Sequence, residues 1–252
     1  MKIGANLTWL FTEYEFLARP AAAKAAGFDA VEVLFPYETP ATALADAIAT
    51  AGLTLALINT PPTETTGRAA LPDQIDAFRT DFARATDYAR AAGSPMLHVM
   101  AGVTDASGAR ETLVANLRWA AAHAPDLTLT IEPLNPRDVP GYFVCDFFQA
   151  AALVAEIDAS NLGLQFDVYH AQMIHGDALK VWQALRPLSA HAQIAAAPDR
   201  TEPDATTLDV IARLKTDGYV GTVSAEYGPR GTTDEGLGWL SLAKKIAASE
   251  GS

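Results

Sequence analysis

The chain has 252 residues, half of them hydrophobic, and its 30 acidic and 18 basic side chains give a net charge of -12. Such a chain can bury a substantial core and is not a candidate for intrinsic disorder. The negative charge repels phosphodiester backbones at long range, so we expect no nucleic acid partner. The length suits one (β/α)8 barrel of about 250 residues, although two smaller domains would fit it equally well.

Cysteine content and hydropathy bear on the compartment. The single cysteine, Cys145, excludes an intrachain disulfide and favours a reducing environment. The sequence shows no basic and apolar leader, and no apolar stretch approaches the roughly 20 residues that span a bilayer. We therefore expect a soluble, cytoplasmic protein with no membrane partner. Assembly into a homo-oligomer is left open.

Short apolar runs alternate with alanine-rich, helix-like segments along the chain. The predicted strands cover residues 3–7, 30–35, 53–59, 95–100, 127–132, 162–167, 189–194 and 220–226. The predicted helices cover residues 13–26, 42–51, 73–92, 110–122, 146–157, 177–185, 207–215 and 234–248. Gly27, Gly52, Gly93 and Gly218 follow helices, where a left-handed cap is common. Strict alternation of strand and helix predicts a parallel sheet.

A closed barrel and an open doubly wound sheet share this alternation. Open dinucleotide-binding sheets carry a glycine-rich turn after the first strand, whereas residues 6–10 here read NLTWL. Eight strand–helix units in about 250 residues, with polar residues after many strands, favour the α/β class and a TIM barrel. No Ser/Gly-rich linker or charge run divides the chain, so we expect a single (β/α)8 domain over residues 1–252.

Four polar residues end four successive strands in the second half of the chain: Glu132, Asp167, Gln193 and Glu226. Since side chains alternate along a strand, and the residues two positions back are small or polar, the four candidates should share one face. Three carboxylates and one amide oxygen suit a hard divalent ion, Mg²⁺ or Mn²⁺, better than zinc or copper. A helix cap or rim salt bridge explains each residue alone equally well, but the set of four favours one shared site.

Several motifs resemble the hydroxypyruvate isomerase family of xylose isomerase-like barrels. They are ANL at 5–7, FTE at 11–13, FPY at 35–37, IEPLN at 131–135, FDVYH at 166–170, HAQIA at 191–195 and EY at 226–227. Other segments look closer to the 2-oxo-tetronate isomerase branch: NT at 59–60, HVMAGV at 98–103, PDR at 198–200 and residues 229–239. The resemblance covers nearly the whole chain.

The resemblance implies an aldose–ketose type isomerisation of a small hydroxy-oxo acid, in the hydroxypyruvate or 2-oxo-tetronate class, through an enediol. The acid/base glutamates of the family correspond to Glu132 and Glu226, and its metal ligands to Glu132, Asp167, Gln193 and Glu226. A divalent cation would stabilise the developing enediolate while one carboxylate removes a proton and the other returns one. The sequence does not decide whether the metal is essential.

Three further residues are candidate substrate contacts. In the family a histidine at the position of His170 contacts substrate oxygens, and a hydrogen bond within the rim is the alternative. Arg200 suits a bidentate contact to a substrate carboxylate, with a solvated loop arginine as the alternative. His98 ends the fourth strand and would line the pocket, although a hydrogen-bonded core histidine is the simpler interpretation.

The chain departs from the family pattern in loops that recognise substrate. Gly228 stands where the family usually has a lysine, and Thr201 where it usually has a histidine. The segment at 205–208 and the loop at 60–71 also differ from the family. These changes leave the substrate open and the proton-transfer residues intact. A ketose 3-epimerase and a non-catalytic sugar-acid-binding protein remain alternatives, whereas only five histidines and the acidic charge argue against a phosphodiesterase.

Overall fold

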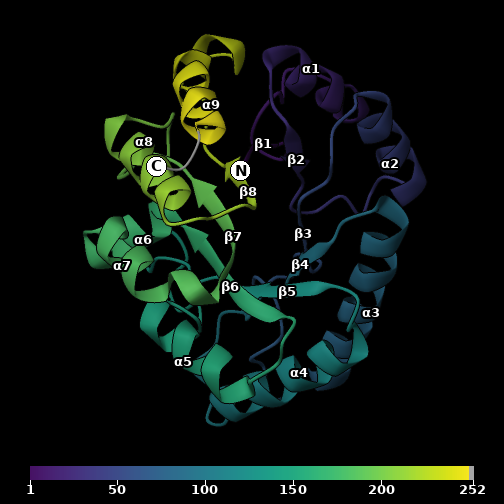
Figure 1. The fold of residues 1–252 in the computed structure, drawn as a ribbon. Helices are drawn as coiled ribbons and strands as arrows, with labels where there is room; N and C mark the ends of the chain where they lie inside the picture. The colour runs from purple at the N-terminus through teal and green to yellow at the C-terminus, as the bar shows by residue number, and fades with distance from the viewer. Residues whose placement is uncertain (250–252) are drawn as a thin grey trace.

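A ring of helices surrounds central strands in the computed structural model, which describes residues 1–249 (Figure 1). The strands are β1 (Lys2–Asn6), β2 (Ala30–Glu32), β3 (Ile58–Asn59), β4 (Met96–His98), β5 (Thr128–Ile131), β6 (Leu162–Asp167), β7 (Ser189–Ile194) and β8 (Thr222–Ala225). They form one eight-stranded sheet in the order β2-β1-β8-β7-β6-β5-β4-β3, and the strand pairs are parallel. The predicted barrel class is confirmed.

Hydrogen bonds between β2 and the segment that leads into β3 bring the two ends of this sheet together. The amide of Val31 donates to the carbonyl of Thr54 at 2.9 Å, and the amide of Ala56 donates to the carbonyl of Val31 at 2.8 Å. Because β3 has only two residues, this contact is an isolated parallel bridge between Val31 and Leu55. The barrel is therefore nearly closed, with its weakest seam between β2 and β3.

The helices follow the strands in turn around the outside. They are α1 (Arg19–Ala26), α2 (Ala41–Thr50), α3 (Ile75–Ala92), α4 (Ala109–His123), α5 (Phe147–Ile157), α6 (Val168–His175), α7 (Ala178–Leu185), α8 (Ala205–Thr216) and α9 (Leu240–Ala248), with short 3-10 turns η1 (Phe16–Ala18), η2 (Arg186–Leu188) and η3 (Asp234–Trp239). Within residues 1–249, none of these helices has the length and apolar character that crossing a membrane requires.

The first predicted helix, over residues 13–26, is too long. The structure has the turn η1 and then α1, which begins at Arg19 with Pro20 in its first turn. Proline lacks an amide hydrogen and clashes with the preceding turn, so it fits the start of a helix and not its interior. Pro20 therefore sets the start of α1.

Two helices lie between β6 and β7, where the sequence predicts only one over residues 177–185. The additional helix, α6, begins directly after Asp167, whose carboxylate accepts the amide hydrogen of Tyr169 at 2.8 Å. Gly176, with φ of 73°, ends α6 in the left-handed conformation, and Asp177 then caps α7. Asp167 is thus both a strand-end residue and an N-cap, two interpretations that the sequence treats as alternatives.

The apolar core lies between the barrel and its helices, and aromatic rings fill part of it. Phe82 on α3 is fully buried, and its ring centroid lies 6.0 Å from that of Phe78 and 5.6 Å from that of Trp119 on α4. The contact of Phe82 with Trp119 is edge-to-face and that with Phe78 is tilted, and such aromatic contacts add to the free energy of apolar burial. Through this cluster α3 packs against α4, on the side of the barrel away from β7 and β8 (Figure 1).

We predict that Phe82→Ala lowers the free energy of unfolding by about 3–5 kcal/mol, because it leaves a cavity between two helices. Urea denaturation monitored by circular dichroism measures this. The matched control is Phe148→Ala on α5, whose ring is 51% exposed and should cost less than about 1 kcal/mol. Equal losses in the two variants would contradict the packing argument.

Candidate active site

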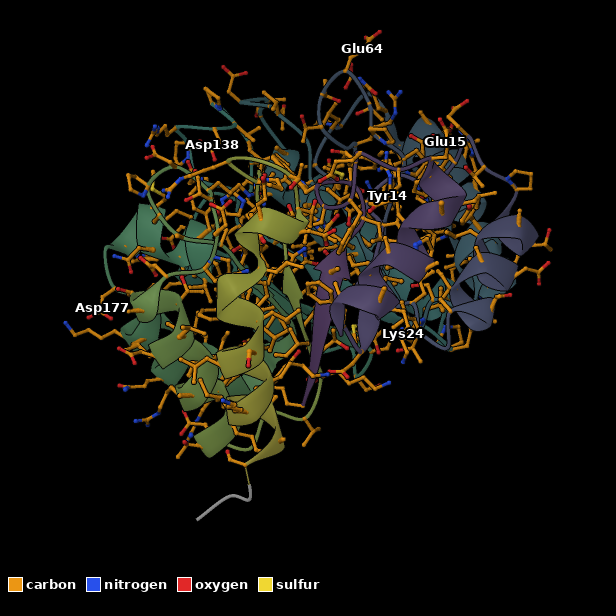
Figure 2. All side chains as sticks on the ribbon, turned by 90° about the horizontal axis from the view of Figure 1, so that it is seen from above. Tyr14, Glu15, Lys24, Glu64, Asp138 and Asp177 are labelled. Atoms are coloured by element: carbon orange, nitrogen blue, oxygen red, sulfur yellow. The ribbon has the colours of Figure 1, made fainter. Side chains whose placement is uncertain are left out.

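The four predicted strand-end residues lie at the carboxyl end of the barrel. Asp167 ends β6 and pairs in register with Gln193 of β7, while Glu132 and Glu226 directly follow β5 and β8. All four are buried. Loops that follow strands gather at this end, as the positions of Glu64 and Asp138 show (Figure 2). The structure therefore brings the four residues together, as the alternation of side chains predicts.

Arg200, in the loop after β7, links two of these carboxylates. Its Nη2 donates to Oδ2 of Asp167 at 3.3 Å and to Oε1 of Glu226. The guanidinium lies between two aromatic rings, 5.0 Å from the centroid of Trp9 and 5.1 Å from that of Tyr169. Aromatic faces attract a cation, so the rings and the carboxylates together hold Arg200 in place. The solvated loop arginine that the sequence allows is not what the structure contains.

The carboxylates raise one another's proton affinity because they are buried close together. Burial raises the pKa of Glu132 well above its usual value, and the charges of Asp167 and Glu226 raise it further. Burial likewise raises the pKa of Asp167 and brings that of Glu226 to about 8, against the opposing effect of Arg200. Without a further cation, the cluster therefore retains protons near neutral pH.

The donor atoms fit a divalent cation. Oε1 of Glu132 is buried and has no hydrogen-bond partner among residues 1–249. Glu132, Asp167 and His170 each offer one atom within 4.8 Å of the others. A cation at such a site would replace the retained protons and satisfy the unpaired oxygen, which is the chemistry that hard divalent ions favour.

His170 itself is better suited to donate a hydrogen bond than to bind a metal. Its Nδ1 accepts the backbone amide hydrogen of Asn135 at 3.0 Å, and burial lowers the pKa of the imidazole well below its usual value. A neutral ring with an accepting Nδ1 carries its proton on Nε2. That Nε2 is buried, lies 3.7 Å from Oδ2 of Asp167, and has no hydrogen-bond partner among the described residues. The ring therefore presents an N–H to the site, which suits the predicted contact to a substrate oxygen.

His98 lies beside Glu132, with Nδ1 at 3.5 Å from Oε2. Burial lowers the pKa of this imidazole to about 3, so the ring is neutral. Neither ring nitrogen has a hydrogen-bond partner within residues 1–249, so the structure does not support a core histidine with its hydrogen bonds satisfied. The residue remains a candidate for lining the pocket.

Four buried polar residues that contact one another or this cluster are absent from the predicted site. They are Asn6, Glu32, Gln165 and His191, on β1, β2, β6 and β7. Glu32 accepts hydrogen bonds from Asn6 at 2.7 Å and from Gln193 at 2.6 Å, and contacts His191 at 2.6 Å. Burial opposes its ionisation, but His191 and these hydrogen bonds lower its pKa. The sequence signal that could have identified Glu32 is an acidic residue inside an apolar run.

Gly228, the site of the missing family lysine, supports the loop of Arg200. Its amide donates to the carbonyl of Arg200 at 2.9 Å. A Cβ at this position would lie 3.8 Å from Cζ3 of Trp9, an ordinary contact distance. The backbone contact keeps Arg200 over the cluster, and Trp9 lies beside the position where a longer side chain would start.

Comparisons with known proteins were made for the whole chain. A family model described as xylose isomerase-like TIM barrel matches residues 20–243. The chain is 42% identical over 253 aligned positions to 2-oxo-tetronate isomerase from Cupriavidus necator, covering 95% of this chain and 97% of that protein. It is 35% identical over 253 positions to hydroxypyruvate isomerase from Escherichia coli, covering 95% and 98%.

Solved structures agree on the fold. One from Brucella melitensis, named AP endonuclease, family 2, is 38% identical with a TM-score of 0.91, covering 96% of this chain and 98% of that one. D-psicose 3-epimerase from Clostridium cellulolyticum is 18% identical with a TM-score of 0.77, covering 98% and 96%. At that identity the second likeness shows a shared barrel and nothing about the reaction.

We predict that the chelator-treated protein loses on the order of 1 kcal/mol of stability between about pH 7 and pH 9. Folded Glu226 keeps its proton up to about pH 8, whereas an unfolded glutamate releases it near 4.5, so rising pH favours the unfolded state. The pKa values of His98 and His170 are lowered, so above about pH 7 both are neutral in both states and add no slope.

Urea denaturation at several pH values measures this slope. Glu226→Gln should reduce it, since Glu132 also has a raised pKa and adds to the slope, and excess Mn²⁺ should restore stability at pH 9 in the unaltered protein. A flat profile in the chelated protein would contradict the raised pKa of Glu226.

Proposed function

Because the chain belongs to the hydroxypyruvate isomerase family of xylose isomerase-like TIM barrels, we propose that it interconverts an aldehyde and a ketone in a small hydroxy-oxo acid. The chain is an isomerase of this family. The substrate class we assign is that of hydroxypyruvate or a 2-oxo-tetronate. The observation that carries the proposal is that hydrogen bonds connect two buried glutamates, Glu132 and Glu226, in one cluster. The same cluster contains Asp167 and Arg200.

The two glutamates transfer protons. One carboxylate takes the proton from the carbon next to the carbonyl, and the electron pair of that bond forms the enediolate. The other carboxylate returns a proton to the neighbouring carbon, which was the carbonyl carbon. The hydroxyl proton on the first carbon passes to the oxygen of the former carbonyl, so that the first carbon becomes the new carbonyl and the second carries the hydroxyl. A divalent ion held by Glu132, Asp167, Gln193 and Glu226 would stabilise the negative charge that develops on the two oxygens.

Arg200 and His170 would orient the substrate. Nη1 of Arg200 makes no hydrogen bond to any residue in the range 1–249, so it is available to a substrate carboxylate. The N–H on Nε2 of His170 would donate to a substrate oxygen next to Asp167. Holding the carboxylate at one end places the reacting carbons near the glutamates, which is the main requirement for efficient proton transfer.

Two other reactions are separable by experiment. A ketose 3-epimerase would use the same two carboxylates but leave the carbonyl in place, so analysis of the products distinguishes it. Phosphodiester cleavage would require DNA to approach a chain whose net charge is -12. A non-catalytic binding protein would bind small sugar acids with no turnover or proton exchange.

We predict that, with Mg²⁺ or Mn²⁺ present, solvent deuterium enters a substrate carbon during turnover. Glu132→Gln and Glu226→Gln should each lower kcat by about 10²- to 10⁴-fold, since removing a proton-transfer group costs that much. Mass spectrometry of the product in heavy water measures both effects. The control is Glu64→Gln, an exposed carboxylate in the loop after β3, which should behave as the unaltered protein (Figure 2). Unchanged exchange in both active-site variants would refute the proposal.

We also predict that Arg200→Gln reduces the preference for an acid over a neutral analogue such as glyceraldehyde. Losing a charge-assisted contact should lower kcat/KM for the acid by about 10- to 100-fold, and that for the neutral compound by less. Steady-state kinetics on both compounds give the ratio. An equal loss on both would mean that Arg200 only supports the carboxylate cluster.

A further inference from the structure

Two buried side-chain amides connect the two glutamates. Nε2 of Gln193 donates to Oε2 of Glu226, and Oε1 of Gln193 accepts a hydrogen bond from Nε2 of Gln165 at 2.7 Å. The same Nε2 of Gln165 donates to Oε2 of Glu132 at 2.8 Å. Gln193 and Gln165, which we call the amide bridge, are fully buried, so water cannot replace these hydrogen bonds.

An amide has a donor end and an acceptor end of similar shape, so its neighbours decide which way it points. Gln193 directs Nε2 to Oε1 of Glu32 at 2.6 Å as well as to Glu226. Turning Gln193 round would set its oxygen against the oxygens of these two carboxyl groups. The side-chain nitrogens of Gln193 and Gln165 would then point at each other, and both are donors. Both amides would therefore have to turn together.

Glu32 is fixed as an acceptor by other groups. Oδ1 of Asn6 accepts the backbone amide hydrogen of Thr8 at 3.0 Å, and a backbone amide can only donate. Nδ2 of Asn6 must therefore face Glu32, to which it donates at 2.7 Å. His191 contacts the other oxygen of Glu32 through Nε2 at 2.6 Å. The oxygen of Glu32 that faces Gln193 already accepts from Asn6, and an ionised carboxylate has no hydrogen to donate, so Glu32 offers Gln193 only an acceptor.

The amide bridge binds one oxygen of each glutamate and leaves the other oxygen to other partners. Oε2 of Glu132 receives Gln165, and Oε2 of Glu226 receives Gln193 and Asn6. Oε1 of Glu132 has no hydrogen-bond partner among residues 1–249, and Oε1 of Glu226 meets Arg200. In both glutamates, Oε2 is held by amides and Oε1 is directed elsewhere.

We propose that Glu32 is a positioning residue for the isomerase. Its carboxylate sets the direction of Gln193, and through it that of Gln165, so that Oε2 of each glutamate is held by an amide while Oε1 of Glu132 faces the site and Oε1 of Glu226 faces Arg200. This inference rests on the function proposed above. Glu32 ends β2 and is not among the groups assigned to proton transfer or substrate contact, so it acts through the amide bridge.

The kinetic test is Glu32→Gln, which keeps the shape and adds a donor, so that Gln193 is able to turn either way. We expect kcat to fall by about 10- to 100-fold, because misplaced catalytic groups cost that much. KM should change by less than about threefold, since Glu32 contributes nothing to substrate binding. In a Gln165→Met background, where the amide bridge is cut, the cost of Glu32→Gln should be at least about threefold smaller. Additive effects would overturn the proposal.

A second measurement needs no turnover. In the ¹⁵N-labelled, metal-free protein, the side-chain amide signals of Gln165 are identified by their loss in Gln165→Met. Glu32→Gln should shift these signals and speed their hydrogen exchange at least about tenfold, although Glu32 makes no hydrogen bond to Gln165 within residues 1–249, because the effect passes through Gln193.

The control for lost stability is Phe82→Ala, which should destabilise the protein and leave the Gln165 signals unchanged. Unchanged Gln165 signals in Glu32→Gln would refute the positioning role whether or not the protein turns over hydroxypyruvate. Shifted signals in a protein without isomerase activity would instead count against the proposed function alone.

Discussion

The burial of several carboxyl groups at one end of a barrel is the constraint on which the rest of the structure depends. Glu32, Glu132, Asp167 and Glu226 are all buried, and isolated buried carboxylates are costly unless protons, donors or cations compensate. Among the described residues, Arg200 is the arginine that contacts these carboxylates, and side-chain amides supply further donors. The negative charge that these groups leave uncompensated raises the pKa values of Glu132 and Glu226, and a bound divalent ion would compensate it.

The compensation differs among the carboxyl groups. Glu32 accepts hydrogen bonds from Asn6 and Gln193 and contacts His191, and its pKa is lowered. Glu226 has partners on both oxygens, whereas Oε1 of Glu132 has none among residues 1–249, and the pKa values of both glutamates are raised. A raised pKa lets a carboxyl group hold a proton, which a group that transfers protons must be able to do.

The polar residues at the strand ends were predictable because the alternation of side chains along a strand can be read from neighbouring residues. The hydrogen-bond partners of each side chain could not be predicted in this way. Glu132, Asp167, Gln193 and Glu226 followed from alternation, and the structure places them together. Glu32 lies in an apolar run, and its role depends on β1, β7 and β8 lying near β2, which is a matter of register across strands. The direction of the Gln193 amide depends on Glu32, and the tautomer of His170 depends on the backbone amide of Asn135. Both partners are far away in the sequence.

The orientation of Gln193 serves both its predicted role as a metal ligand and its contact with Glu226. As a metal ligand, it would have to offer its oxygen, and as a support for Glu226 it must offer its nitrogen. Both are met by one orientation, with Nε2 toward Glu32 and Glu226 and Oε1 toward Gln165. An amide oxygen has two lone pairs, so accepting from Gln165 leaves one for a cation. Turned the other way, Gln193 would lose both roles at once, so the buried charge of Glu32 would support the proposed cation site and the proposed proton-transfer glutamates through the same side chain.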